Sequence, residues 1–316
     1  MRICIVGAGA VGGLLGARLA LAGHDTVAVA RGATLDALRA HGWRLDTGER
    51  APVVASADPA DLGPQDLVVL AVKAPALPAV APSLGPVLGG DTVVMPAMNG
   101  VPWWFLGEAP PLDAVDPHGA VAAALPRRYL LGCVVHVASA VTEPGIVRQI
   151  SGDTLIVGEP DGGLSARAER IGATLTGAGF QVRVSADVRT DIWYKLWGNM
   201  TMNPISSLTG ATTDRILDDP LVRDFCLAVM AEAAAIGARI GCPIAQSGTD
   251  RMAVTRRLGP FKTSMLQDTE AGRPIELDAL VSVVREIGER VGVPTPSLDT
   301  LLGLTRLAAR TRGLYR

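Results

Sequence analysis

One short stretch of the chain, YKLWGNMTMNP over residues 194–204, places groups capable of acid chemistry among mostly apolar or small side chains. Lys195, Asn199 and Asn203 follow one another at intervals of four residues. On an α-helix this spacing puts the three side chains on one face, one above another. A lysine ammonium can donate a proton to a developing alkoxide, and amides beside it can orient a substrate. A lone lysine–asparagine pair would more simply be a solvated helix face, so the rest of the chain must decide.

The amino-terminal residues predict the element that would bind a cofactor. Residues 2–6, RICIV, are typical of a buried parallel strand, and the GAGAVG that follows has the GxGxxG spacing of dinucleotide-binding loops. A helical run and a second strand, DTVAVAR, come next, which is the context that makes this spacing informative. The loop amides and the helix N-terminus would bind the pyrophosphate. The residues predicted to bind cofactor here are Gly7, Ala8, Gly9, Ala10, Val11 and Gly12.

The end of the second predicted strand bears on which dinucleotide is bound. NAD sites usually place Asp or Glu there, where the carboxylate accepts hydrogen bonds from the ribose hydroxyls. This chain has Arg31 at that position, and Asp25 lies at the opposite end of the strand. Because a guanidinium suits a ribose 2′-phosphate, we expect NADPH rather than NADH. A solvated arginine at a strand end is the simpler alternative.

Further strand-like runs predict a doubly wound parallel sheet of the Rossmann type. QDLVVLAVKA and DTVVMPAMNG follow the first two strands, with helix or turn sequences between them. Lys73 and Asn99 stand at two of the carboxyl ends, where the ligand of such a sheet lies, although both could be ordinary loop residues. Strands within 127–157, and QVRVSADV after them, are expected to extend the same sheet.

The hydrophobic pattern of the sequence changes after Val188. Strand-like alternation disappears, and apolar residues recur at helical spacing over residues 190–203, 216–241, 264–292 and 297–312. We therefore predict a nucleotide-binding α/β domain over 1–188 and an all-helical domain over 189–316. Pro204 is expected to end or kink the first of these helices just after Asn203.

Composition and charge narrow the range of partners. A formal net charge of −2 with 48% hydrophobic residues matches neither a nucleic-acid-binding protein nor a disordered acidic chain, so we expect a small-molecule ligand. The four cysteines form no CxxC pair and the four histidines have no ligand spacing, which favours reduced thiols and no metal. Glycines interrupt the apolar N-terminal run, unlike a signal peptide, and no run reaches the length of a membrane span. The expectation is a cytoplasmic protein.

Six motifs, taken in order, resemble those of the ketopantoate reductase family (2-dehydropantoate 2-reductases) along essentially the whole chain. They are GAGAVG, VKA around Lys73, MNG around Asn99, KLWGNMTMNP, SMLQD around Ser264 and PIELDAL around Glu276. Each is weak by itself, whereas their order and spacing together are specific. The resemblance implies a Rossmann-type NADPH domain followed by a helical domain of the 6-phosphogluconate dehydrogenase C-terminal type.

The resemblance also implies a reaction, the NADPH-dependent reduction of 2-dehydropantoate to (R)-pantoate with hydride delivered to the C2 carbonyl. Lys195 would then be the proton donor to the developing alkoxide. Asn199 and Asn203 would hold the lysine and the carboxylate or hydroxyl of the substrate. Asn99 would lie close to the nicotinamide and the carbonyl, and Glu276 would accept a hydrogen bond from the terminal hydroxyl of the substrate.

The remaining implied roles concern the substrate carboxylate and the cofactor. Ser264 would contact the carboxylate, and Lys73 and Arg31 would belong to the cofactor side. Members of the family often carry an asparagine three residues before this serine, where the chain has Phe261, which puts one substrate contact in doubt. Trp103 and Trp104, just beyond Asn99, are expected to be core residues, but they would narrow the pocket if they faced it.

Three other assignments stay open at this point. The enzyme could reduce a different 2-keto acid with NADPH. A 3-hydroxyacid dehydrogenase also combines a dinucleotide domain with helices and a lysine followed four residues later by asparagine, although the SMLQD and PIELD motifs favour the ketopantoate type. A non-catalytic NADPH sensor would have no need of the row formed by Lys195, Asn199 and Asn203. The apolar helical faces are compatible with a homodimer.

Overall fold

A computed structural model describes residues 1–315 and divides the chain into two compact units. The first unit comprises Met1–Pro111 and Asp116–Arg189, and the second comprises residues 112–115 and 190–316. A single boundary in the sequence therefore misses the short segment 112–115, which belongs to the second unit. Two consecutive amides of this segment, those of Asp113 and Ala114, donate to the Glu286 carboxylate at 3.0 and 2.9 Å.

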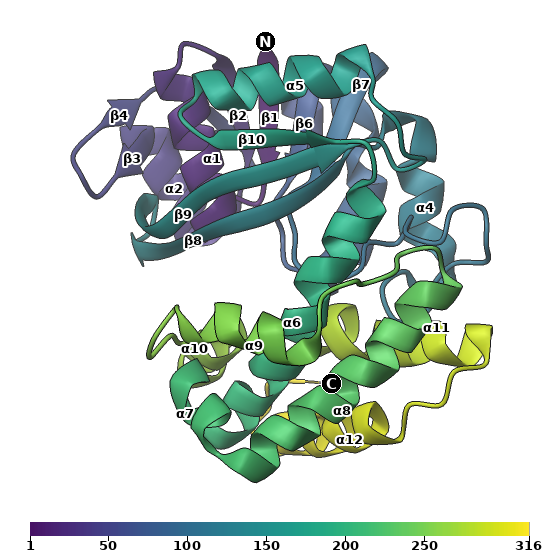
Figure 1. The fold of residues 1–316 in the computed structure, drawn as a ribbon. Helices are drawn as coiled ribbons and strands as arrows, with labels where there is room; N and C mark the ends of the chain where they lie inside the picture. The colour runs from purple at the N-terminus through teal and green to yellow at the C-terminus, as the bar shows by residue number, and fades with distance from the viewer. Residues whose placement is uncertain (316) are drawn as a thin grey trace. The chain divides into compact units, whose positions relative to one another are not determined.

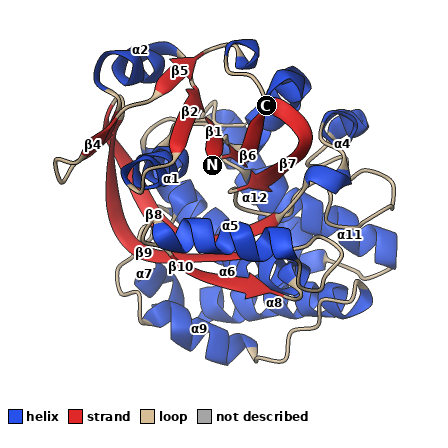
Figure 2. Cartoon of the chain, turned by 90° about the horizontal axis from the view of Figure 1, so that it is seen from above, coloured by secondary structure: helices blue, strands red, loops and turns tan. Residues whose placement is uncertain are grey.

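The first unit contains the predicted parallel sheet. Its five strands lie in the order β5-β2-β1-β6-β7, and all neighbouring pairs are parallel (Figure 2). β1 and β6 have neighbours on both sides, and their side chains are almost wholly buried, as their runs of valine, isoleucine and leucine predict. The strands are β1 (Arg2–Val6), β2 (Asp25–Val29), β5 (Val54–Ser56), β6 (Gln65–Leu70) and β7 (Leu88–Pro96).

The later strands do not extend this sheet, so that prediction was wrong. They form a second sheet in the order β10-β9-β3-β4, with β8 paired antiparallel to β9. Its strands are β3 (Trp43–Leu45), β4 (Arg50–Ala51), β8 (Gly132–Glu143), β9 (Ile146–Gly158) and β10 (Gln181–Ser185). Strand patterns identify which residues alternate between faces, but they do not name the partner strand, and here β9 pairs with β3 from the beginning of the chain.

Helix α1 (Ala10–Leu21) contacts both sheets, and Figure 1 shows it beside β8 and β9 of the second sheet. A Cβ on Gly13 would lie 2.6 Å from Val147 of β9, and one on Gly16 would lie 2.5 Å from the Trp43 ring of β3. The Trp43 indole also donates to Thr26 Oγ1 of β2 at 2.9 Å, which joins the two sheets. The small residues of VGGLLG therefore let one helix pack closely on two layers.

The other helices of the first unit are shorter than the sequence patterns suggest. α2 (Gly32–His41) follows β2, and α5 (Ala166–Gly177) packs on β9 and β10. The region between β6 and β7 contains only α3 (Leu77–Val80) and 3₁₀ turns, since its prolines remove backbone donors. α4 (Ala120–Ala124) lies in the irregular connection from β7 to β8.

Helices make up the second unit, as predicted. The elements are α6 (Val188–Thr209), α7 (Thr213–Asp218), α8 (Pro220–Arg239), α9 (Gly248–Arg256), α10 (Ser264–Glu270), α11 (Val283–Val291) and α12 (Pro296–Thr311). Two long runs are interrupted where continuous helix is expected. Asp219 caps a new helix that starts at Pro220, and Gly272, with a φ of +65°, ends the turn after α10. Across the described residues, no helix has both the length and the hydropathy that a bilayer span requires.

Pro204 does not end its helix, which excludes one of the two outcomes predicted for it. α6 continues five residues past it, to Thr209. Pro204 is buried, so packing supports the turn that lost a backbone donor. The hydroxyls of Ser206 and Thr209 donate to the carbonyls of Asn203 and Ile205 at 3.0 and 2.7 Å, which satisfies acceptors in this last part of the helix.

Candidate functional site

The carboxyl ends of four strands lie level at one edge of the first sheet. The register places Val29, Val6, Leu70 and Pro96 in one row, on β2, β1, β6 and β7. The glycine loop begins at the first residue after β1, and Arg31 is the second residue after β2. Lys73 is the third residue after β6, and Asn99 is the third residue after β7. Because neighbouring strands are about 4.8 Å apart, this edge gathers all the predicted cofactor residues.

Two glycines of the loop are required by the protein's own packing. Gly7 has a φ of +94°, and a Cβ there would lie 2.8 Å from the Val72 side chain. A Cβ on Gly12 would lie 2.1 Å from the carbonyl oxygen of Gly7, which is backbone and cannot move aside. Any side chain at either position would therefore separate the loop from β6 or the helix from the loop.

Gly9 differs from these two, because no contact with the described part of the protein requires a glycine there. Its φ is −80°, which any residue adopts, and a Cβ there would have no atom within 4 Å. Within the described residues, no side chain caps α1 and no acidic residue occupies its first turn, so no side chain satisfies the first amides of this helix. An open, positively polarised helix end beside a glycine fits the pyrophosphate of a dinucleotide.

The other three residues of this edge differ in exposure. Arg31 precedes α2 and is exposed, and Lys73 precedes a 3₁₀ turn and is exposed as well. Asn99 is partly buried in the loop that follows β7. The carboxyl end of β2 carries no acidic residue, since Ala30 and Arg31 follow Val29. The edge therefore lacks the carboxylate by which NAD sites hold ribose hydroxyls.

In the second unit, two tryptophans fix the rotation of α6. The indoles of Trp193 and Trp197 donate to the carbonyls of Ala233 and Met230 on α8, at 3.2 and 2.7 Å. Lys195 lies two residues after Trp193, a rotation of about 200° around the helix axis. The face that carries Lys195 and Asn199 is therefore turned away from α8, and both side chains are only partly buried.

Asn203 and Ser264 are brought near one another by hydroxyl contacts between α6 and α10. Ser206, one turn after Asn203, forms a hydrogen bond with the Thr263 hydroxyl, and Thr263 caps the helix that begins at Ser264. A second hydroxyl pair, Ser207 with Thr269 at 2.6 Å, holds the same two helices. Asn203 is 5% exposed, whereas Ser264 is exposed, so the serine is the more accessible group.

Glu276 is partly buried and lies just before a π-helical turn, Asp278–Ser282. Turns of this kind often occur at functional sites. The segment is held by the end of the chain, because the Ile275 amide donates to the Leu314 carbonyl at 3.1 Å and the Tyr315 hydroxyl donates to Asp278 at 2.6 Å. Burial first, and then the bond to Asp278, raise the pKa of Tyr315 to about 12, so its hydroxyl stays a donor at neutral pH.

Tyr315→Phe is expected to loosen the backbone that carries Glu276. Within the described residues, the variant leaves the Asp278 carboxylate with one side-chain donor, the Ser282 hydroxyl. The free energy of unfolding is expected to fall by about 1 to 3 kcal/mol. The thermal midpoint and kcat/KM for the keto acid should both fall, while cofactor affinity stays unchanged. Tyr129→Phe, which alters a hydroxyl in the first unit, is the matched control. Unchanged kcat/KM in Tyr315→Phe would show that this contact does not position Glu276.

The three aromatic residues that bear on the choice of substrate differ in exposure. Trp103 and Trp104 are 6% and 4% exposed, as the core interpretation predicts. Trp104 packs near Gly132, and its carbonyl accepts a 2.7 Å bond from Arg127. Phe261 is partly buried in the loop before α10, and its carbonyl accepts from the Thr213 amide at 3.0 Å. Among the three, Phe261 retains the exposure that contact with a ligand would need.

The described cysteines and acidic residues bear on the requirements of thiol and metal chemistry. All four cysteines are buried, and burial raises the pKa of Cys4 and of Cys226 to about 12. The thiols of Cys4 and Cys226 therefore stay protonated and are poor nucleophiles. In the part of the chain that the structure describes, no group of three or more His, Cys, Asp or Glu side chains is arranged to hold a metal ion.

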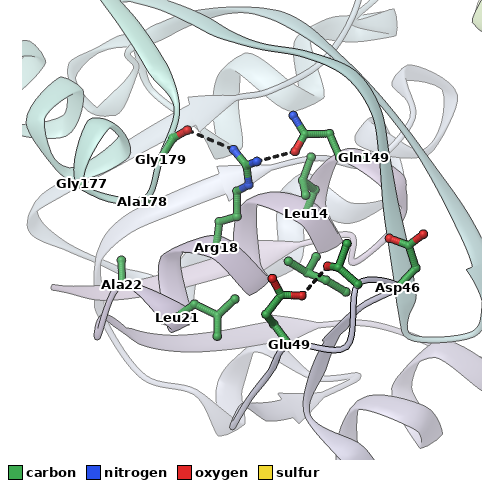
Figure 3. A pocket seen from close by; sticks show the side chains of 12 residues that line it. Leu14, Arg18, Leu21, Ala22, Asp46, Glu49, Gln149, Gly177, Ala178 and Gly179 are labelled. Carbon is green, nitrogen blue, oxygen red and sulfur yellow. Dashed lines mark hydrogen bonds between the residues drawn. The ribbon is translucent and has the colours of Figure 1, made fainter.

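A cavity of about 520 Å³ lies elsewhere in the first unit, along the second half of α1 (Figure 3). Arg18 crosses it, donating to Gln149 and to the Gly179 carbonyl, and Asp46 and Glu49 line the side formed by the β3–β4 turn. These polar groups have protein partners. The cavity is separate from the glycine motif over residues 7–12, and none of the predicted site residues lines it.

The parallel sheet, its glycine loop and the open helix N-terminus define the class of dinucleotide-binding α/β proteins, here joined to a helical unit. Residues 3–162 match the family model for ketopantoate reductase PanE/ApbA, and residues 187–309 match the model for the C-terminal part of the same family. The chain therefore belongs to the ketopantoate reductase family. It is an oxidoreductase acting on a CH–OH group, and the family implies a nicotinamide cofactor.

Individual relatives agree with this assignment. The chain is 44% identical to the 2-dehydropantoate 2-reductase of Mesorhizobium japonicum, over 100% of both chains. It is 62% identical, with a TM-score of 0.96 and 99% of both chains covered, to a crystal structure from Ralstonia solanacearum MolK2 provisionally assigned as a ketopantoate reductase. A D-mandelate dehydrogenase bound to NADH and anilino(oxo)acetate shares the fold at 19% identity, with a TM-score of 0.85 and 99% and 100% of the two chains covered.

Proposed function

We propose that the protein reduces 2-dehydropantoate to (R)-pantoate with NADPH. The observation that carries this proposal is the tryptophan-anchored helix α6, which turns Lys195 and Asn199 away from its packed face in a chain of the ketopantoate reductase family. A proton donor with a neighbouring amide matches what carbonyl reduction requires. The 2-dehydropantoate 2-reductase of Mesorhizobium japonicum supports the same substrate.

A nicotinamide cofactor, when bound, would supply the hydride that reduces the C2 carbonyl of the substrate. Lys195 donates a proton to the carbonyl oxygen as negative charge develops there, which is worth about 10²- to 10⁴-fold in rate for a positioned acid. Asn199 and Asn203 orient the ammonium and the substrate, and Asn99 donates a hydrogen bond at the carbonyl. Glu276 accepts a hydrogen bond from the terminal hydroxyl of the substrate.

The remaining residues bind the ends of the two ligands. Ser264 donates to the substrate carboxylate. The amides that follow Gly9 bind the pyrophosphate, where a Cβ would meet no protein atom. Lys73 and Arg31 provide positive charge at the same sheet edge, and a charge-assisted bond from Arg31 selects the 2′-phosphate of NADPH.

Arg31 is the residue on which the cofactor preference depends. The D-mandelate dehydrogenase structure contains NADH, so the fold by itself does not select between the two dinucleotides. Arg31→Ala is expected to raise KM for NADPH about tenfold to hundredfold and to leave KM for NADH nearly unchanged, because only the 2′-phosphate loses a partner. Steady-state nicotinamide absorbance measures both constants. Arg50→Ala, at another exposed arginine of the first unit, is the control, and equal changes for the two cofactors would contradict this role.

The substrate is tested by turnover of a panel of 2-keto acids with NADPH. The proposal expects the highest kcat/KM for 2-dehydropantoate. A second candidate, reduction of a different 2-keto acid, is favoured by Phe261, an apolar side chain where related enzymes often have an asparagine. Preference for a bulkier or more apolar keto acid, shifted towards 2-dehydropantoate by Phe261→Asn, would support that candidate. Absence of turnover with every keto acid would refute both.

A further inference from the structure

An arginine that the sequence motifs do not include lies against the helix that carries Lys195. Arg251 belongs to α9, and its guanidinium lies over the Tyr194 ring with its carbon 5.4 Å from the ring centroid. It also lies against Gly198, where a Cβ would be 2.6 Å from Arg251 Nη2. Both contacts are on α6, on either side of Lys195 in the sequence.

The hydrogen bonding of this guanidinium is incomplete. Nη1 donates to Thr255 Oγ1 at 3.2 Å, while Nε is buried without a partner. Among the described residues, no carboxylate forms an ion pair with Arg251, in contrast to Arg167, which pairs with Glu159. Burial holds the pKa of Arg251 below its usual value. Partial burial of an arginine without a paired anion costs free energy, and a ligand that supplies the anion would offset that cost.

Gly198 shows that α6 is adapted to this arginine. Glycine in the interior of a helix costs about 1 kcal/mol relative to alanine. Any side chain at position 198 would occupy the place of the guanidinium, whose Nη2 and Cζ lie 2.6 and 3.0 Å from the Cβ position. The glycine therefore keeps a cation on the surface of the helix.

The same geometry places the guanidinium near the proposed proton donor. Gly198 is three residues after Lys195, and side-chain positions at this spacing are about 5–6 Å apart. A cation seated on Gly198 is thus one helical turn from the lysine. In a 2-keto acid the carboxylate is bonded directly to the carbonyl carbon, so two cations at this separation suit the two adjacent oxygen groups.

We propose that Arg251 is a further substrate-binding residue, whose guanidinium pairs with the carboxylate of the 2-keto acid while Lys195 acts on the carbonyl oxygen. This inference rests on the proposed function. It makes a 2-keto carboxylate, rather than any other carbonyl compound, the class of substrate that the site recognises. The competing explanation is that Arg251 only clamps α9 to Tyr194.

The test compares a 2-keto acid with its uncharged 2-keto amide in the full-length protein. Arg251→Gln is expected to raise KM for the acid about tenfold to hundredfold and to leave KM for the amide, NADPH affinity and the thermal midpoint unchanged. Arg251→Lys should recover part of the loss. Arg256→Gln is the matched control, because Arg256 is an exposed arginine on the same helix as Arg251 and pairs with Asp218 of α7.

Gly198→Ala provides a second variant in which the charge is kept but displaced. It should raise KM for the acid in the same way, and it should not unfold α6, because alanine favours helix and the atom it meets ends a flexible side chain. Equal effects of Arg251→Gln on acid and amide, or none on either, would overturn this inference while leaving the proposed function intact. Failure of the wild-type protein to reduce any 2-keto acid would overturn both.

Discussion

Replacement of Lys195 by alanine is expected to lower kcat by about 10²- to 10⁴-fold and to leave the affinity for NADPH unchanged. The physical reason is that the developing alkoxide loses its proton donor, whereas the glycine loop and Arg31 are untouched. Single-turnover reduction measured by nicotinamide absorbance reports the chemical step, and quenching of protein fluorescence on NADPH titration reports binding.

Lys262→Ala is the matched control for this variant. Lys262 lies in the same unit and is exposed, with its ammonium 2.7 Å from Glu270. Surface pairs of this kind contribute little to stability, so this variant should behave as wild type. Full turnover in Lys195→Ala would refute the role of Lys195 and show that a different group donates the proton. A joint loss of turnover and NADPH binding would indicate misfolding instead.

The second large effect is a contrast between two glycines of one loop. Gly12→Ala is expected to destabilise the protein by about 3 kcal/mol or more, because its Cβ would lie 2.1 Å from a backbone carbonyl oxygen. Gly9→Ala should change stability by less than about 0.5 kcal/mol and weaken NADPH binding at least about tenfold, since its Cβ would enter only the space proposed for the pyrophosphate.

Chemical unfolding and NADPH titration separate the two outcomes. Gly303→Ala, a helical glycine of α12 with no atom within 4 Å of its Cβ position, is the control and should alter neither property adversely. Unchanged NADPH affinity in Gly9→Ala would remove the argument that this open space holds the cofactor. Wild-type stability in Gly12→Ala would mean that loop and helix can separate without cost.

Much of the fold was predictable because its signals are local. The strand RICIV and the spacing of Gly7, Gly9 and Gly12 specify a turn that few other sequences can form. Hydrophobic periodicity likewise predicted helices throughout the second unit. The second sheet was not predictable, because β3 and β9 are about a hundred residues apart and alternation does not encode which strand pairs with which.

The candidate site shows the same division. The shared helix face of Lys195, Asn199 and Asn203 was predicted from their spacing, since a helix repeats side chains every turn, and their roles were predicted from the family resemblance. Arg251 carries no such signal, because its relation to Gly198 arises from the packing of α9 on α6. Tyr315 also could not be predicted from the sequence, because its bond to Asp278 depends on the chain end reaching the turn after Glu276.

The sequence by itself determined which backbone segment forms the glycine turn and which helix face carries the lysine, because both follow from the identity and spacing of near neighbours. Only the tertiary structure decided that α1 is packed between two sheets, that Gly9 faces open space while Gly12 meets a carbonyl, and that an arginine lies against Gly198. These features depend on contacts between residues remote in the chain, whose free energies no local pattern records.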